Sequence, residues 1–144
     1  MSRLDDDVIY DMPDFGDHVD NGIFSQILEM DESDSDRDFS MPLVSNFFEQ
    51  ASETFIKMDK ALVDVDLRNL SDLGHFLKGS SATLGFNKIR DSCQIIQQYG
   101  NGFNIDGSQQ VDEDTSIKKI QEAITKVKLD TAELEKLMRK FFGY

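Results

Sequence analysis

A single histidine in the middle of the chain carries the strongest chemical signal in the sequence. His75 lies in the stretch "LGHFLKGSSATLG", where Gly74, Gly79, two serines and Lys78 surround it. Glycine inside a helix costs about 1 kcal/mol relative to alanine. The leucines of the same stretch nevertheless recur at helical spacing. The segment is therefore expected to be a helix that tolerates poor helix formers for a reason connected with His75.

A helical wheel of this segment turns His75 away from the apolar stripe. With Leu70 at zero, the other leucines fall within about 60°, whereas His75 falls at about 140° and Gly79 at about 180°. Ser71 and Ala82 are also small and are placed on the same outer face. We therefore expect an exposed imidazole with room beside it for another molecule to approach.

Two further groups could take part in chemistry at this histidine. Lys78 follows His75 by three residues, so its ammonium can reach the space above the ring and balance an anion carried there. In an antiparallel hairpin that turns near Gly85, Gln97 stands at the height of His75, where its amide could hydrogen-bond the imidazole or its substituent. Equally, Lys78 could be only solvated, and Gln97 could form an interhelical hydrogen bond without a functional role.

The residue types exclude several reaction classes. A hydrolytic triad needs a nucleophile, a base and an orienting acid together, and no second histidine or cysteine cooperates with His75. Zinc needs three or four ligands, and no phosphate-binding loop ending in GK[ST] is present. We therefore expect no metal site, and an exposed histidine that accepts and releases a phosphoryl group in chemistry organised by another protein.

Five helical patterns must position these groups. The first is short, "GIFSQILEM", with Phe24 and Leu28 in one apolar row and Ile23, Ile27 and Met30 in another. No alternation of period two competes with the helical spacing. The four longer patterns cover residues 44–62, 67–84, 89–100 and 117–141. The sequence therefore predicts an all-α fold, an up-and-down antiparallel four-helix bundle with a short extra N-terminal helix.

Helix ends and core residues are predicted from local signals. Ser40 followed by Met and Pro resembles an N-cap, and Asp114 or Thr115 is the expected cap of the last helix. The glycine- and asparagine-rich residues 100–114 are expected to be a loop. Cys93 falls on an apolar stripe and is expected to be a small core residue, not a nucleophile.

Negative charge is concentrated at the front of the chain. The net charge is -13, and residues 1–38 hold 13 acidic and 2 basic side chains, against 15 acidic and 13 basic in the remainder. We interpret residues 1–20 as a mobile acidic arm, with His18 solvated, and residues 21–144 as one domain. The absence of a basic stripe argues against nucleic acid or an anionic membrane as a partner. One cysteine, no long apolar run and no signal-peptide pattern predict an intracellular protein.

The stretch "HFLKGSSATLG" resembles the signature of histidine-containing phosphotransfer (HPt) proteins, roughly H-x-L-K-G-S/A-S/A-x-x-L/I-G. Every fixed position is met, at His75, Leu77, Lys78, Gly79, Ser80, Ser81, Leu84 and Gly85. Beyond it, "DLGHFLKGSSATLGF" and "CQIIQQYG" look like the fungal phosphorelay intermediates of osmotic-stress signalling, a resemblance that extends over about residues 22–142.

The resemblance implies a phosphorelay carrier. His75 would accept a phosphoryl group on Nε2 from the receiver-domain aspartate of a hybrid sensor histidine kinase and pass it to a response-regulator aspartate. Lys78 and Gln97 would stand beside it. The receiver would supply Mg²⁺, so this chain would need no cofactor of its own and would have no autonomous ATP-dependent activity.

The family also implies a docking surface and a location. Phe24 and Leu28 would face the bundle, and Gly79 and Ala82 would leave clearance for the receiver. The residues expected to contact it are Ile23, Ile27, Met30, Ser71 and Phe76. A monomer in cytoplasm and nucleus would fit, since the family's acceptors include transcriptional regulators.

A different interpretation is a non-catalytic helical adaptor or dimerisation module. The regular three- and four-residue spacing of residues 117–141 and the apolar short helix favour it. A kinase-like enzyme that uses ATP directly is a third interpretation, and it predicts labelling from ATP alone.

Overall fold

The computed structural model of the protein describes residues 15–33 and 36–143. Over these residues every regular element is a helix, and strand-like pairing is confined to two isolated bridges. The elements are, in chain order, the 3-10 turn η1 (Gly16–His18) and the helices α2 (Asn21–Leu28), α3 (Ser40–Val63), α4 (Leu67–Leu84), α5 (Asn87–Gly100) and α6 (Glu113–Phe142). None of these helices is long and apolar enough to cross a membrane.

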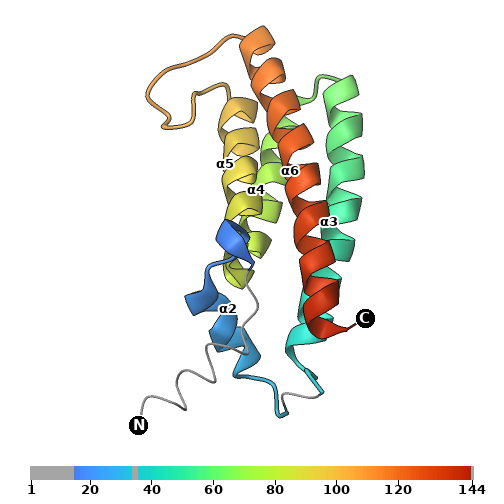
Figure 1. Ribbon diagram of the computed structural model, residues 1–144. Coiled ribbons are helices and arrows are strands. Elements are labelled where there is room, and N and C mark those ends of the chain that lie inside the picture. Colours follow the sequence, from blue (N-terminus) through green and yellow to red (C-terminus); the bar gives the residue numbers. More distant parts are fainter. Residues whose placement is uncertain (1–14, 34–35, 144) are drawn as a thin grey trace.

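The four long helices lie side by side and alternate in direction (Figure 1). α4 packs against α3 and α5, and α6 packs against the same two helices from the other side, which closes the bundle. The short α2 lies beside the end of the bundle where α4 turns into α5 (Figure 1). The predicted fold class is therefore confirmed.

The core consists of apolar side chains repeated along each long helix. Fully buried examples are Leu70 and Leu77 of α4 and Ile89 and Ile96 of α5. Near α2 the core is aromatic, with the rings of Phe15, Phe24, Phe47, Phe48 and Phe86 in edge-on, tilted or stacked contact. Cys93 is also buried, as predicted, and burial raises the pKa of its thiol to about 12. A thiol with that pKa is protonated at neutral pH and inert as a nucleophile.

Residues 15–20 pack against the bundle, although they were expected in the acidic arm. Phe15 and Val19 are buried, and the backbone N–H of Asp20 donates to the carbonyl of Gly85 at 2.7 Å. His18 is therefore not solvated as expected, because its neighbours carry it into the fold. It is 3% exposed, and its Nε2 lies 3.2 Å from Oε1 of Glu133. Residues 1–14 of the expected arm lie outside the described residues.

Two predicted helix caps are wrong by a short distance. α6 is capped by Asp112, whose carboxylate accepts from the N–H of Thr115 at 2.7 Å, and not by Asp114 or Thr115. An aspartate two residues earlier is needed because a capping side chain bonds the N–H three residues ahead. Ser40 is the first residue of α3 and not its N-cap. Residues 101–112 form the expected loop.

Asp31 caps α3 from outside the helix. Its carboxylate accepts from the N–H groups of Phe39 and Ser40 at 2.8 and 2.7 Å, and from the Ser40 hydroxyl at 2.6 Å. Its side chain is fully buried and lies 3.5 Å from the Arg37 guanidinium. Burial alone would raise the pKa of Asp31, but these hydrogen bonds and the Arg37 charge outweigh it and lower the pKa. Asp31 thus ties the segment after α2 to the start of α3.

Replacing Asp31 should destabilise the fold. We expect Asp31→Ala to lower the free energy of unfolding by about 1–3 kcal/mol, because three donors lose a buried acceptor. Because the pKa of Asp31 is lower in the folded state, this contribution is present above the ordinary carboxyl pKa and is lost as the pH falls through the folded pKa. Urea unfolding across a pH series measures both effects.

Glu32→Ala is the matched control, since the Glu32 side chain is exposed and the charge change is the same. We expect it to stay within about 0.5 kcal/mol of the wild type. An Asp31→Ala difference that persists unchanged into strong acid would show that the carboxylate charge does not contribute.

Candidate functional site

The helix that carries His75 has the bounds predicted for it. The Asp66 carboxylate caps α4 by accepting from the N–H of Asn69 at 3.1 Å. At the other end Gly85 adopts φ 78°, and the N–H of Phe86 returns to the carbonyl of Ser81. This left-handed ending favours glycine because a side chain would crowd the following carbonyl. Both ends of α4 are thus held by local interactions, and the register of His75 follows from them.

His75 is exposed at the middle of α4, as the wheel predicted. Next to it Phe76 is 50% exposed. Lys78 and Ala82 are half-buried, and Gly79 is exposed with no atom within 4 Å of the position that a Cβ would occupy. The structure therefore shows the open space beside His75 that the small residues predicted.

Gly74 faces the opposite way and has a packing role. A Cβ at Gly74 would lie 3.0 Å from the backbone oxygen of Cys93 and 3.0 Å from the backbone nitrogen of Gln97. Gly100 of α5 is placed reciprocally, since its Cβ would lie 2.8 Å from the backbone of Leu67. The two glycines therefore let the backbones of α4 and α5 touch.

This close approach places the backbone of Gln97 against Gly74, the residue next to His75. The Gln97 side chain is half-buried, and its Oε1 is buried without a hydrogen-bond partner among the described residues. Sequence reasoning predicted Gln97 from its height in the hairpin, and the structure places it against α4 at that height. The side-chain NH₂ of glutamine is a hydrogen-bond donor, and it is the group suited to an acceptor carried by the imidazole.

Ser71 does not belong to the exposed face, which corrects the prediction. It is 5% exposed, and its hydroxyl donates to the carbonyl of Gln97 at 3.0 Å and lies 2.9 Å from Oδ1 of Asn101. The wheel put Ser71 beside the outer face, but α5 covers that side of α4. A wheel of one helix cannot show where its neighbour packs.

The predicted exposed row on the short helix is also wrong in part. Ile27 is buried, whereas Met30 is 63% exposed and Ile23 is half-buried against Gly85. Both rows of α2 contact the bundle because its apolar face is wide, and α2 ends at Leu28, so Met30 lies in the turn beyond it. Phe24 and Leu28 are buried, as expected.

The remaining signature residues serve the architecture of α4. Ser81 is fully buried and its hydroxyl donates to the carbonyl of Lys78 at 3.0 Å, while the Ser80 hydroxyl donates to the carbonyl of Phe76 at 3.3 Å. Gly85 ends the helix and holds Asp20. The anchoring role of Gly85 was missed, since nothing in the sequence pairs residues so far apart.

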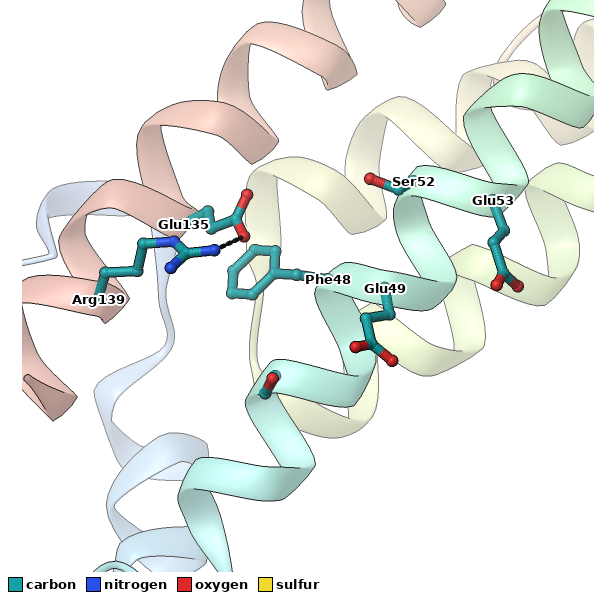
Figure 2. Close-up of a pocket in the computed structure, with 7 residues that line it drawn as sticks. Phe48, Glu49, Ser52, Glu53, Glu135 and Arg139 are labelled. Carbon is teal, nitrogen blue, oxygen red and sulfur yellow. Dashed lines mark hydrogen bonds and ion pairs between the residues drawn. The ribbon is translucent and has the colours of Figure 1, made fainter. Parts of the chain in front are cut away.

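Other potential sites in the described residues lack the chemistry of the His75 face. A groove of about 350 Å³ lies between α3 and α6 (Figure 2). It contains an ion pair between Arg139 and Glu135 at 3.2 Å and no residue of α4 or α5. Its lining residues are Ser45, Phe48, Glu49, Ser52, Glu53, Glu135 and Arg139. The described residues contain no group of three or more histidine, cysteine or acidic side chains placed to hold a metal ion.

Comparison with known proteins points to one family. The family model described as "Hpt domain" matches residues 42–129. The multistep phosphorelay regulator 1 of Schizosaccharomyces pombe is 51% identical over 89 residues, which are 62% of this chain and 30% of that protein. The phosphorelay intermediate protein YPD1 of Candida albicans is 47% identical over 91 residues, 63% of this chain and 48% of that protein. The chain thus spans less than half the length of these curated relatives.

Solved structures agree over a larger share of the chain. The crystal structure of the yeast phosphorelay protein YPD1 superposes with a TM-score of 0.73 and 30% identity, and covers 88% of this chain and 95% of that one. A co-crystal structure of Saccharomyces cerevisiae Ypd1 with the receiver domain of its downstream response regulator Ssk1 gives a TM-score of 0.75 at 29% identity, with coverage of 88% and 95%.

The two glycines that flank His75 should respond oppositely to alanine. We expect Gly74→Ala to lower the free energy of unfolding by about 1–3 kcal/mol, because the methyl group meets backbone atoms that cannot move aside. Gly79→Ala should raise it by up to about 1 kcal/mol, since the methyl group enters empty space and alanine favours the helix. Urea unfolding of both variants measures the contrast, and equal effects would contradict the different environments.

Proposed function

Because the chain belongs to the Hpt domain family, we propose that it is a phosphorelay intermediate. His75 accepts a phosphoryl group from the receiver-domain aspartate of a hybrid sensor histidine kinase and passes it to the aspartate of a response regulator. The observation that carries the proposal is the exposure of His75 beside an open space at Gly79. The chain has two histidines, and the other one, His18, is buried.

The transfer is a direct displacement at phosphorus. The unprotonated ring nitrogen, Nε2, forms a bond to the phosphorus of the aspartyl phosphate, and the bond from phosphorus to the carboxylate oxygen breaks with its electron pair. The aspartate leaves as a carboxylate, and the reverse displacement on a second receiver restores the imidazole. Such a transfer depends on in-line positioning and on stabilisation of the charge on the phosphoryl oxygens.

The two proteins divide these tasks. The stiff α4 fixes the direction of the imidazole, while Lys78 contributes positive charge and Gln97 an amide hydrogen bond to the phosphoryl oxygens. The receiver contributes Mg²⁺ and its acidic pocket, so this chain needs no cofactor or ATP of its own. Gly79 and Ala82 are small and leave the space through which the receiver reaches the ring.

An apolar surface that includes the residue next to the histidine is proposed to hold the receiver. It consists of Phe76 and Met30, which are exposed, and Ile23, which is half-buried. Association over an apolar patch excludes water from the transferring group and anchors the partner. Ser71 and Ile27 are not part of this surface, because both are buried.

The same role suggests a location and a signal. A carrier that links a kinase receiver to transcriptional regulators is required in both cytoplasm and nucleus, and we propose both for this protein, acting as a monomer. Osmotic stress is the proposed signal.

Phosphotransfer to His75 can be tested directly. The protein is incubated with a phosphorylated receiver domain and Mg²⁺, and we expect a label that is stable to alkali and labile to acid, as phosphohistidine is. The label should be absent in His75→Gln. His18→Gln is the matched control and should be labelled, because the buried His18 is outside the site.

A label that persists in His75→Gln would show that the histidine is not the acceptor. Absence of label from the folded wild type with several receivers would favour the helical adaptor, and labelling from ATP alone would favour a kinase-like enzyme.

Gly79 tests the clearance without altering the reacting group. We expect Gly79→Gln to slow transfer at least tenfold, since a side chain beside the ring displaces the receiver by more than the approximately 1 Å that in-line reactions tolerate. The open surroundings of Gly79 mean that the melting temperature should not fall. Labelling reactions quenched at a series of times measure the transfer rate, and thermal melting measures the melting temperature. Gly79→Ala serves as a variant with a side chain of intermediate size. Unchanged transfer in Gly79→Gln would refute the need for clearance.

A further inference from the structure

The buried hydroxyl of Ser71 forms its hydrogen bonds with another helix and not within its own. It lies one helical turn before His75, and its hydroxyl donates to the carbonyl of Gln97 at 3.0 Å and also lies 2.9 Å from Oδ1 of Asn101. A buried serine can bond within its own helix, as Ser81 does with Lys78. Ser71 instead bonds across to the last turn of α5 and to the C-cap residue of that helix.

The carbonyl groups in the last turn of α5 accept from N–H groups at and just beyond the end of the helix. The carbonyl of Gln97 accepts from the N–H of Asn101 at 3.1 Å as well as from Ser71. Ser71 therefore adds a bond from α4 to the turn whose geometry sets the direction of the Gln97 backbone. Without it the carbonyl of Gln97 keeps the N–H of Asn101 as its donor, at a helix end where hydrogen bonds fray.

The glycine contacts make this bond a determinant of register. A Cβ at Gly100 would lie 2.8 Å from the backbone nitrogen of Ser71 and 2.9 Å from its Cβ, so the serine stands at the point where the two backbones touch. A contact through glycine has no side chain that fixes the position of one helix along the other, whereas a hydrogen bond has a preferred position and direction. Ser71 thus locks the relative position of α4 and α5 close to His75.

The Gln97 amide depends on that lock. Its Oε1 has no hydrogen-bond partner among the described residues, so no bond to that oxygen holds the side chain in place. Its position relative to His75 follows from the backbone of the turn that Ser71 holds.

We propose that Ser71 is a positioning residue for phosphoryl transfer, whose hydroxyl fixes the last turn of α5 so that the Gln97 amide meets the phosphoryl group on His75. The proposal rests on the proposed phosphorelay function. Ser71 is buried by α5, so it acts through Gln97 and not through contact with the receiver.

The test is the rate of transfer from a phosphorylated receiver in Ser71→Ala. We expect the rate constant at saturating receiver to fall about tenfold, the size of effect that a small misplacement produces. The receiver concentration for half-maximal rate should not change, because the docking surface is intact. The backbone N–H of Asn101, which donates to Gln97, should exchange with deuterium at least tenfold faster, while α3 amides keep their wild-type rates.

Thr54→Val is the matched control. Thr54 is as buried as Ser71, and its hydroxyl donates to the carbonyl of Gln50 within α3 at 2.7 Å. It should keep the wild-type transfer rate whatever happens to its melting temperature. Ser71→Cys, which keeps a small side chain but makes a weaker hydrogen-bond donor, should slow transfer in the same direction and remains decisive if Ser71→Ala does not fold.

A wild-type transfer rate in a folded Ser71→Ala or Ser71→Cys variant would overturn the positioning role while leaving His75 as the carrier. A raised half-maximal concentration with an unchanged maximal rate would overturn it too, since that result assigns Ser71 to docking. Failure of the wild type to accept a phosphoryl group would overturn the carrier function itself, and is distinguished by the absence of label in every variant.

Discussion

The direct contact between the backbones of α4 and α5 is the constraint on which the site depends. Gly74 and Gly100 permit it, because a methyl group at either position would press on backbone atoms of the other helix. The contact brings Gln97 to the residue beside His75 and places Ser71 within hydrogen-bonding distance of the last turn of α5. With α5 held in this way, the side of α4 that carries His75 stays exposed. The packing on the buried face of α4 thus determines which residues lie close to His75.

Glycine has two different tasks within one short segment of this helix. At Gly74 it allows two helices to approach, and at Gly79 it keeps a surface empty. Both positions cost the helix the same intrinsic stability, so propensity alone cannot tell them apart. The difference lies in what surrounds each residue. The signature stretch is therefore a mixture of residues that build the helix, such as Ser81 and Gly85, and residues that leave room above it.

Much of this arrangement follows from the sequence, and the remainder depends on how the helices meet. The bounds of α4 and the outward direction of His75 come from leucine spacing, which is a property of one helix. Ser71 was misplaced because the side on which α5 lies is set by the contact between two helices. The burial of His18 and the capping of α3 by Asp31 were missed for a related reason. His18 contacts Glu133, and Asp31 contacts Ser40. No local sequence pattern relates the members of either pair.

The attachment of the N-terminal segment has a consequence for the substitutions that the fold tolerates. Asp20 is held to Gly85 by atoms of the main chain, and Val19 pairs with Phe86 in a short bridge. These main-chain interactions add to the burial of Phe15, Val19 and Phe24, so two kinds of interaction hold the segment. The exposed side chain of Met30 takes part in neither kind of interaction, so replacing it leaves the segment in place. The exposed side of this segment can therefore change without disturbing the helix that bears the histidine.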